Sequence, residues 1–235
     1  YKRQQNIAVG ACALYGQSGN CSYKNIGIGF TAGKCITTGT DNSFIGNGAG
    51  VNITTGKFNS IIGSSLSGVA GAAGEALTTG CCNVALGNGA LKLTTTANDN
   101  VAVGTLALGA NTTGAAQVAI GHGALIANTT GGGNTAVGGS ATLNNNTTGS
   151  NNVALGNNAL DANTTASDNT ALGAGAMYAT TTGCENVAVG RRALFTNVSG
   201  DNNVAVGFCA LKVSLADDNT AVGFNSLKLN TSGTR

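Results

Sequence analysis

Few residues in this chain could do chemistry, and the cysteines are the most numerous of them. The seven cysteines are Cys12, Cys21, Cys35, Cys81, Cys82, Cys184 and Cys209. An odd number leaves at least one thiol free or available to another molecule. Bridges within loops, Cys12 to Cys21 or Cys21 to Cys35, are expected in an oxidising compartment. A zinc site is disfavoured because no two cysteines are spaced as CxxC and the chain has one histidine.

That histidine, His122, and the few carboxylates form no catalytic constellation. A nucleophile or general base needs an orienting partner at a fixed spacing, and none recurs around His122. Five acids directly precede a recurring asparagine: Asp41, Asp99, Asp168, Glu185 and Asp218. The glycine-rich pattern of calcium-binding β-rolls is missing, so we interpret these as solvated turn carboxylates. We therefore expect no enzymatic activity, no metal and no cofactor.

The most regular chemical signal is the sequon Asn-x-Ser/Thr. It occurs at Asn20, Asn52, Asn111, Asn128, Asn145, Asn146, Asn163, Asn197 and Asn230. Six of them, Asn111, Asn128, Asn145, Asn163, Asn197 and Asn230, lie seven residues after a recurring glycine. In a cell that performs N-glycosylation, this register predicts a line of glycans along the turns. The alternative is that Asn and Thr are simply favourable turn residues, and both interpretations stay open.

These residues lie on a repeat of the form Asn-Val-Ala-Val-Gly that returns thirteen times. Its glycines are Gly10, Gly29, Gly46, Gly63, Gly87, Gly104, Gly121, Gly138, Gly156, Gly173, Gly190, Gly207 and Gly223. Most successive glycines are 17 residues apart, within a range of 16 to 24. Such regularity is typical of repeat architectures and not of a globular enzyme core. We expect residues 1–235 to form a single repeat array with an irregular insertion at about 64–82.

Aligned on the glycine, the repeats form columns with distinct chemistry. The residue four positions before the glycine is asparagine in every repeat but one, which has Gln117. The asparagines are Asn6, Asn25, Asn42, Asn59, Asn83, Asn100, Asn134, Asn152, Asn169, Asn186, Asn203 and Asn219. An amide both donates and accepts, so this column predicts a hydrogen-bonded ladder. The residue directly before the glycine is Val, Ile or Leu, as in Val103, Ile120, Val137, Leu155 and Leu172. We expect this column to be the core, with the preceding alanine facing the other way.

After the glycine comes an Ala-Leu pair, as in Ala107-Leu108, which we expect to be a second short strand or a corner. A polar turn such as Asn111-Thr-Thr-Gly114 follows. One such unit cannot bury an apolar face alone, whereas stacked units can. The pattern therefore predicts an all-β fold, a parallel β-solenoid or β-roll of about thirteen coils. At about 4.8 Å per coil it would be a rod roughly 60 Å long.

The composition agrees with stacked strands. Gly is 38 of 235 residues and Pro is absent, as expected where every strand donates its N–H groups. Charged residues are 9% and the formal net charge is +2. The sequence contains no run of 18 apolar residues, so it predicts no membrane span. Nucleic acid is disfavoured as a partner because basic residues are scattered, apart from Lys2-Arg3 and Arg191-Arg192.

The strand-plus-corner segments Asn100-Val-Ala-Val-Gly-Thr-Leu-Ala-Leu108 and Asn203-Val-Ala-Val-Gly-Phe-Cys-Ala-Leu211 resemble a known type of repeat. They are similar to the head repeats of trimeric autotransporter adhesins and to repeats of viral and phage fibre proteins. The resemblance covers nearly the entire chain. It implies a left-handed parallel β-roll, often three side by side, that serves adhesion or forms a fibre shaft.

We therefore expect an extracellular structural or adhesive fibre subunit on a cell or virion surface. Its principal partner would be itself, as a head-to-tail polymer or a homotrimer, with glycans or a host surface as further partners. A trimeric adhesin or viral fibre segment that binds a cell-surface ligand is one alternative. An ice-binding β-solenoid is another, suggested by the Thr-Thr turns.

Overall fold

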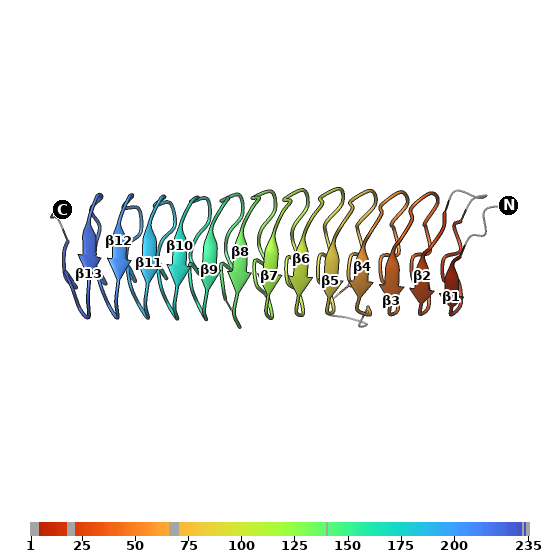
Figure 1. Cartoon of the computed structure of the whole chain (residues 1–235), viewed down its shortest axis with the longest axis horizontal. Coiled ribbons are helices and arrows are strands. Elements are labelled where there is room, and N and C mark those ends of the chain that lie inside the picture. The colour runs from red at the N-terminus through yellow and green to blue at the C-terminus, as the bar shows by residue number, and fades with distance from the viewer. Residues whose placement is uncertain (1–4, 18–21, 66–70, 140, 232, 234–235) are drawn as a thin grey trace. The chain divides into compact units, whose positions relative to one another are not determined.

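The computed structural model describes residues 5–17, 22–65, 71–139, 141–231 and 233. All its regular elements in this part of the chain are three-residue β-strands, and the chain is a parallel β-solenoid (Figure 1). It divides into two compact units, residues 1–117 and 118–235. The predicted fold class is confirmed.

Each unit is a stack of parallel strands paired in sequence order and in exact columns. The first unit contains β1 (Ile7–Val9), β2 (Ile26–Ile28), β3 (Ser43–Ile45), β4 (Ser60–Ile62), β5 (Val84–Leu86) and β6 (Val101–Val103). The second contains β7 (Val118–Ile120), β8 (Thr135–Val137), β9 (Val153–Leu155), β10 (Thr170–Leu172), β11 (Val187–Val189), β12 (Val204–Val206) and β13 (Thr220–Val222). We call a strand with the residues up to the next strand a coil, and number coils by their strands.

The expected core face is wrong: the strands bury their middle residue and not the residue before the glycine. Ala102 and Ala188 are fully buried, whereas Ile28 and Ile62 are each 39% exposed. The side chains alternate along the strand as predicted. The prediction, however, put the larger side chain inside, whereas the structure has it outside. The interior is narrow and is already filled from the opposite side, so in most coils it has room only for alanine.

The leucine of the Ala-Leu pair supplies that filling. No strand forms there in the described residues; instead, successive turns close with N–H bonds from Ala107 to the carbonyl of Gly104 (3.2 Å) and from Gly109 to that of Leu106 (3.0 Å). Leu106 and Leu108 have φ of +60° and +52°. This left-handed conformation turns the fully buried Leu108 inward. Of the two expected alternatives, the corner is the one that forms, as consecutive tight turns.

The recurring glycine is required by the spacing between coils. Eleven of the thirteen have φ between +124° and +136°, a region that side chains rarely adopt. A Cβ on Gly29 would lie 2.5 Å from the carbonyl oxygen of Gly46 in the next coil, and Gly190 faces Gly207 in the same way. Any larger residue would push adjacent coils apart, which explains why this column does not vary.

The predicted asparagine ladder forms inside each unit. Asn59 donates from Nδ2 to Oδ1 of Asn42 (3.0 Å) and to the carbonyl of Gly80 (2.9 Å). Its backbone N–H also donates to Oδ1 of Asn42 (3.0 Å). Asn186 repeats this arrangement with Asn169 and Gly200. Each fully satisfied amide thus connects three coils, and the low polarity around it strengthens these bonds.

Candidate functional site

Most of the sequons prove to be structural. Asn128, Asn146 and Asn163 are fully buried and form a second amide ladder on the turn side of the coil. Asn146 donates from Nδ2 to Oδ1 of Asn128 (2.7 Å), and Asn163 donates to Oδ1 of Asn146 (2.7 Å). Each also closes its own turn, as in the bond from Asn146 Nδ2 to the carbonyl of Gly149 (2.9 Å).

This burial counts against glycans on five of the predicted acceptors. Asn111, Asn128, Asn146, Asn163 and Asn197 have no exposed side chain in the folded chain. A glycan on Nδ2 would replace a ladder hydrogen bond and would need a path out of the stack. The sequon pattern arises here because Asn closes the turn and a threonine follows it.

The remaining sequons differ in position. Asn52 and Asn145 are exposed, and their Nδ2 atoms donate to the carbonyls of Glu75 (2.8 Å) and Asp161 (2.9 Å). Asn230 donates to Oδ1 of Asn219 (2.9 Å). Asn20 lies outside the described residues. Glycosylation of Asn52 and Asn145 stays a prediction. The coil after β8 is one residue longer, which moves Asn145 out of the buried column and Asn146 into it.

The cysteines are not paired within the described residues: Cys12, Cys35, Cys81, Cys82, Cys184 and Cys209 are free thiols. Both bridges that we expected involve Cys21, which lies outside the described residues. Cys81 and Cys184 occupy one column, six residues before the glycine, and their sulfurs accept the N–H of Lys57 (3.3 Å) and Ser167 (3.4 Å). Polar side chains elsewhere in this column do the same, as in the bond from Cys184 N–H to Asp201 (2.7 Å).

Cys82 has no features of an activated nucleophile. Desolvation, with smaller contributions from Asp99 and Cys81, raises the pKa of the Cys82 thiol. A raised pKa lowers the thiolate fraction at neutral pH. His122 is exposed at a corner, as expected. No group of three metal-ligating side chains occurs in the part of the chain that the structure describes.

The acids before the asparagine ladder have a local backbone reason. Asp99, Asp168 and Glu185 are exposed and have φ of +58° to +60°. Asp and Asn tolerate this left-handed conformation better than most residues. Nδ2 of Asn151 donates to Oδ1 of Asp168 (3.1 Å) in the next coil. Asp99, Asp168 and Glu185 are thus exposed turn carboxylates, as the sequence predicted.

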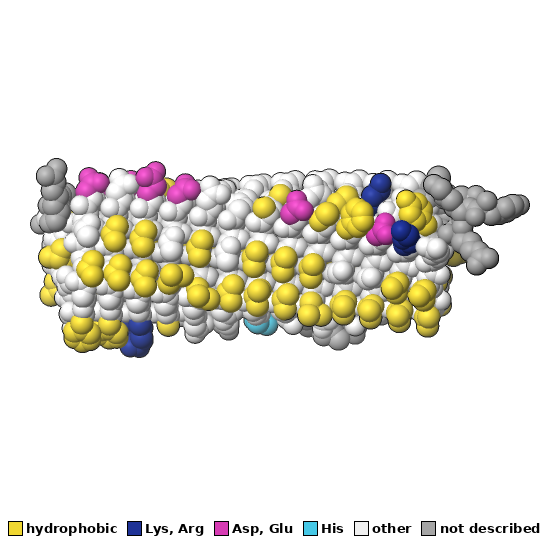
Figure 2. Space-filling model, in the orientation of Figure 1, with side chains coloured by type: hydrophobic (Ala, Val, Ile, Leu, Met, Phe, Trp, Pro, Cys, Tyr) yellow, Lys and Arg dark blue, Asp and Glu magenta, His cyan; other side chains and the backbone are white. Residues whose placement is uncertain are grey.

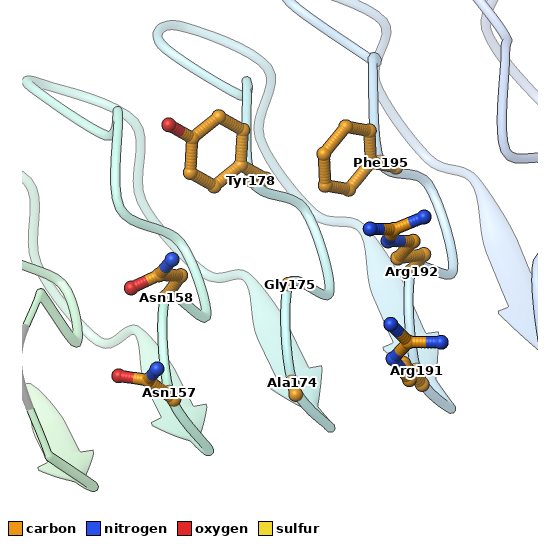
Figure 3. Close-up of a pocket in the computed structure, with 8 residues that line it drawn as sticks. All are labelled: Asn157, Asn158, Ala174, Gly175, Tyr178, Arg191, Arg192 and Phe195. Carbon is orange, nitrogen blue, oxygen red and sulfur yellow. The ribbon is translucent and has the colours of Figure 1, made fainter.

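The second unit has a groove that the sequence did not predict. It has a volume of about 360 Å³ and lies across the corners that follow β9, β10 and β11 (Figure 3). Asn157 and Asn158 form the wall in coil 9, and Arg191 and Arg192 form the wall in coil 11. Both pairs stand directly after the recurring glycine of their coils.

Coil 10 forms the floor of the groove, because it carries Ala174 and Gly175 at the equivalent positions. A Cβ on Gly175 would lie 3.3 Å from Phe195 and 3.6 Å from Cγ of Arg192. Tyr178 and Phe195 border the groove on one side, with parallel rings whose centroids are 5.1 Å apart. A bulky residue in place of Gly175 would therefore project into the groove toward Phe195 and Arg192.

The aromatic rings hold the basic side chains beside the groove. The guanidinium of Arg192 lies 5.5 Å from the Phe195 ring centroid, and Lys212 Nζ lies 6.0 Å from the same ring. Arg191 lies 5.8 Å from the centroid of Phe208. The Arg191-Arg192 pair is visible in the sequence. Its aromatic partners become apparent only when the repeats are aligned: Phe195 lies five positions after its glycine, as Tyr178 does, and Phe208 lies one position after its glycine.

The outer face of the strands is the second candidate surface. In the first unit it carries Ile28, Ile45 and Leu86, and in the second Ile120 and Leu155, all more than a third exposed. Figure 2 shows hydrophobic side chains in rows over the strands of each unit. The outward strand positions carry only Val, Ile, Leu, Ser and Thr, with no charge. Each unit therefore presents an uncharged, largely aliphatic face.

Comparisons with known proteins give no relative. No family model, no curated protein and no solved structure matches this chain. Within the described residues, no helix has the length and apolarity needed to cross a membrane. The candidate surfaces must therefore be interpreted from their own chemistry.

Proposed function

We propose that this chain is an extracellular structural fibre protein, without enzymatic activity, whose copies associate side by side through the outer faces of their strands. The observation that carries the proposal is the uncharged aliphatic face of each unit. Extracellular placement rests on the resemblance to adhesin heads and viral fibres.

The exposed aliphatic columns support association because they are continuous and not scattered. Single exposed hydrophobic residues are normal on a soluble protein, but large contiguous apolar patches usually mark interaction sites. In the second unit Ile120, Val137, Leu155 and Leu172 stand in adjacent, exactly registered strands. A flat row of β-branched and leucine side chains is well suited to pack against a second copy of itself.

Sedimentation velocity of the full chain tests the proposal. We expect an oligomer in the wild type and a shift toward monomer in Val153→Lys/Leu155→Lys, because two charges on each copy would be desolvated on association. Both side chains are exposed in the single chain, so the fold should persist. The control is Thr165→Lys, which adds a charge at an exposed turn position and should leave association unchanged.

Two outcomes would overturn side-by-side association. One is a wild-type chain that stays monomeric at high concentration. The other is an assembly that Val153→Lys/Leu155→Lys leaves intact, seen by electron microscopy as filaments that lengthen with concentration. The latter result would favour the head-to-tail polymer.

A further inference from the structure

The two arginines of the groove have unused hydrogen-bonding capacity. Arg191 and Arg192 are exposed, and neither guanidinium has an ion pair or hydrogen bond to another described residue. Each instead lies over an aromatic ring, Phe208 or Phe195, which limits the positions of the side chain. Two neighbouring guanidinium groups present planar sets of N–H donors that match a carboxylate or sulfate.

The opposite wall offers neutral polar groups. Asn157 and Asn158 line the groove and carry amides that can donate and accept. The two walls belong to coils 9 and 11, so their backbones are separated by two coil steps, about 10 Å. Ala174 and Gly175 leave this interval unfilled. The space is suited to one small ring with polar substituents on both sides.

The third component is a flat apolar surface. Tyr178 and Phe195 are stacked with an interplanar angle of 10°, so their edges and exposed faces form a ledge beside the groove. Aromatic rings bind the C–H face of a ring-shaped ligand through apolar contact while its polar groups stay free to hydrogen-bond. A cation wall, an amide wall and an aromatic ledge together specify an amphipathic, negatively charged ring.

We propose that this groove binds an acidic glycan, with one sugar ring on Tyr178 and Phe195 and its carboxylate or sulfate on Arg191 and Arg192. The sugar hydroxyls would bond to the asparagine wall. Lys212, 6.0 Å from the Phe195 ring centroid, extends the positive charge toward a neighbouring sugar.

Nucleic acid fits this surface less well. A nucleic-acid site needs a basic track that follows many phosphates. Here the positive charge is limited to a short segment. The carboxylate of Asp161 occupies the same column one coil before Tyr178, and the main-chain N–H of Ala162 bonds to the carbonyl of Tyr178 (3.1 Å). A negative group there limits the length of polyanion that the surface can hold.

This inference goes beyond the association proposed above and does not depend on it. The groove lies at the corners of coils 9–11, and all its lining residues belong to one unit of one chain. Glycan binding can therefore be measured in both the wild type and Val153→Lys/Leu155→Lys. A loss of association with binding retained, or the reverse, would separate the two proposals.

The test is calorimetric titration of the full chain with three oligosaccharides of equal length: a carboxylated galacturonate oligomer, a sulfated heparin fragment and a neutral cello-oligosaccharide. We expect one or both acidic probes to bind and the neutral probe to bind at least tenfold more weakly. The two acidic probes distinguish a carboxylate from a sulfate as the preferred group. Equal binding of the neutral probe, or no binding of either acidic probe, would overturn the proposal.

Variants separate a built site from general charge attraction. Arg191→Gln/Arg192→Gln should weaken acidic-glycan binding at least tenfold, whereas Lys57→Gln, a change at an exposed cation in the other unit, should change it less than twofold. Tyr178→Ala keeps the charge and should weaken binding several-fold, with Tyr178→Phe close to the wild type. Equal losses in the arginine variant and Lys57→Gln would overturn the proposal. So would an unchanged Tyr178→Ala, or a single-stranded DNA oligonucleotide that binds as tightly as the acidic glycan.

Discussion

The interiors of the two units solve the same packing problem with different residues. In coils 3 and 4 of the first unit, the strand contributes a large side chain, Phe44 or Ile61, and the corner contributes a glycine, Gly50 or Gly74. In the second unit the strand contributes alanine at every middle position, and the corner contributes a leucine or methionine such as Leu160. A Cβ on Gly50 would lie 2.6 Å from Cδ1 of Phe44, so both sides cannot be large. In these coils one large side chain fills the interior from either the strand or the corner. Coil 2 has Gly27 and Gly33 at the two positions, and Leu14 and Phe44 of the adjacent coils lie against them.

The turn columns show a second exchange. Ile36, Ile53 and Leu77 are fully buried in the first unit at the place where the second unit buries Asn128 and Asn146. An aliphatic residue fills this position by packing, whereas an asparagine fills it by hydrogen bonds to the coils on either side. The amide nitrogens of Asn146 and Asn163 are fully used in this way, whereas Oδ1 of Asn163, where the ladder ends, has no partner. The fold therefore specifies volume and hydrogen-bond balance, and not one residue type.

The largest effect should come from breaking the volume exchange in the first unit. Phe44→Ala removes the largest buried side chain and should lower the free energy of unfolding by about 3–5 kcal/mol. Adding Gly50→Leu reproduces the arrangement of the second unit and should recover about 2 kcal/mol, measured by urea denaturation. Gly50→Leu alone should be destabilising because of overpacking. If the loss in free energy of unfolding of the double variant equals the sum of the two single losses, volume exchange does not relate the two units.

A smaller loss should follow from breaking the amide column of the second unit. Asn163→Leu removes the donor to Oδ1 of Asn146 and to the carbonyl of Ala166, so we expect a loss of about 2–3 kcal/mol. The matched change in the first unit, Ile53→Val, should cost about 1 kcal/mol. Amide hydrogen exchange in the flanking coils would report both. Equal losses would mean that the amide column contributes by packing alone.

The smallest effect is expected for a change that conserves volume. Met177 occupies the corner position that is leucine in most coils of its unit and is fully buried. Met177→Leu should change the free energy of unfolding by less than about 1.5 kcal/mol. Thermal denaturation against the wild type measures it. A loss as large as that of Phe44→Ala would show that this coil depends on the particular shape of Met177.

The sequence predicts the architecture because the repeat constrains it in several independent ways. The recurring glycine, the asparagine column and the absence of proline each favour stacked parallel strands. The amide ladder could be predicted because Asn recurs at one position regardless of its neighbours. The corner glycines Gly33, Gly50 and Gly74 also carried a usable signal, since they occur in the coils whose middle strand residue is not alanine.

What could not be predicted depended on direction and on neighbouring coils. Alternation along a three-residue strand says that Ala136 and Val137 face opposite ways, but it does not say which faces in. That depends on Leu143, which reaches the interior from a corner with φ of +49°. The groove likewise depends on small residues in one coil between larger residues in its neighbours, a relation across three repeats and not within one.

The central claim is that the aliphatic residue before the glycine faces outward and the alanine faces inward, and one pair of substitutions in β8 tests it. Ala136 is fully buried, whereas Val137 beside it is partly exposed. Urea denaturation should show that Ala136→Asp loses several kcal/mol, because an unpaired charge enters the interior, and that Val137→Asp loses about 1 kcal/mol. The opposite order, with Val137→Asp the more damaging variant, would contradict this account of the fold and of its exposed face.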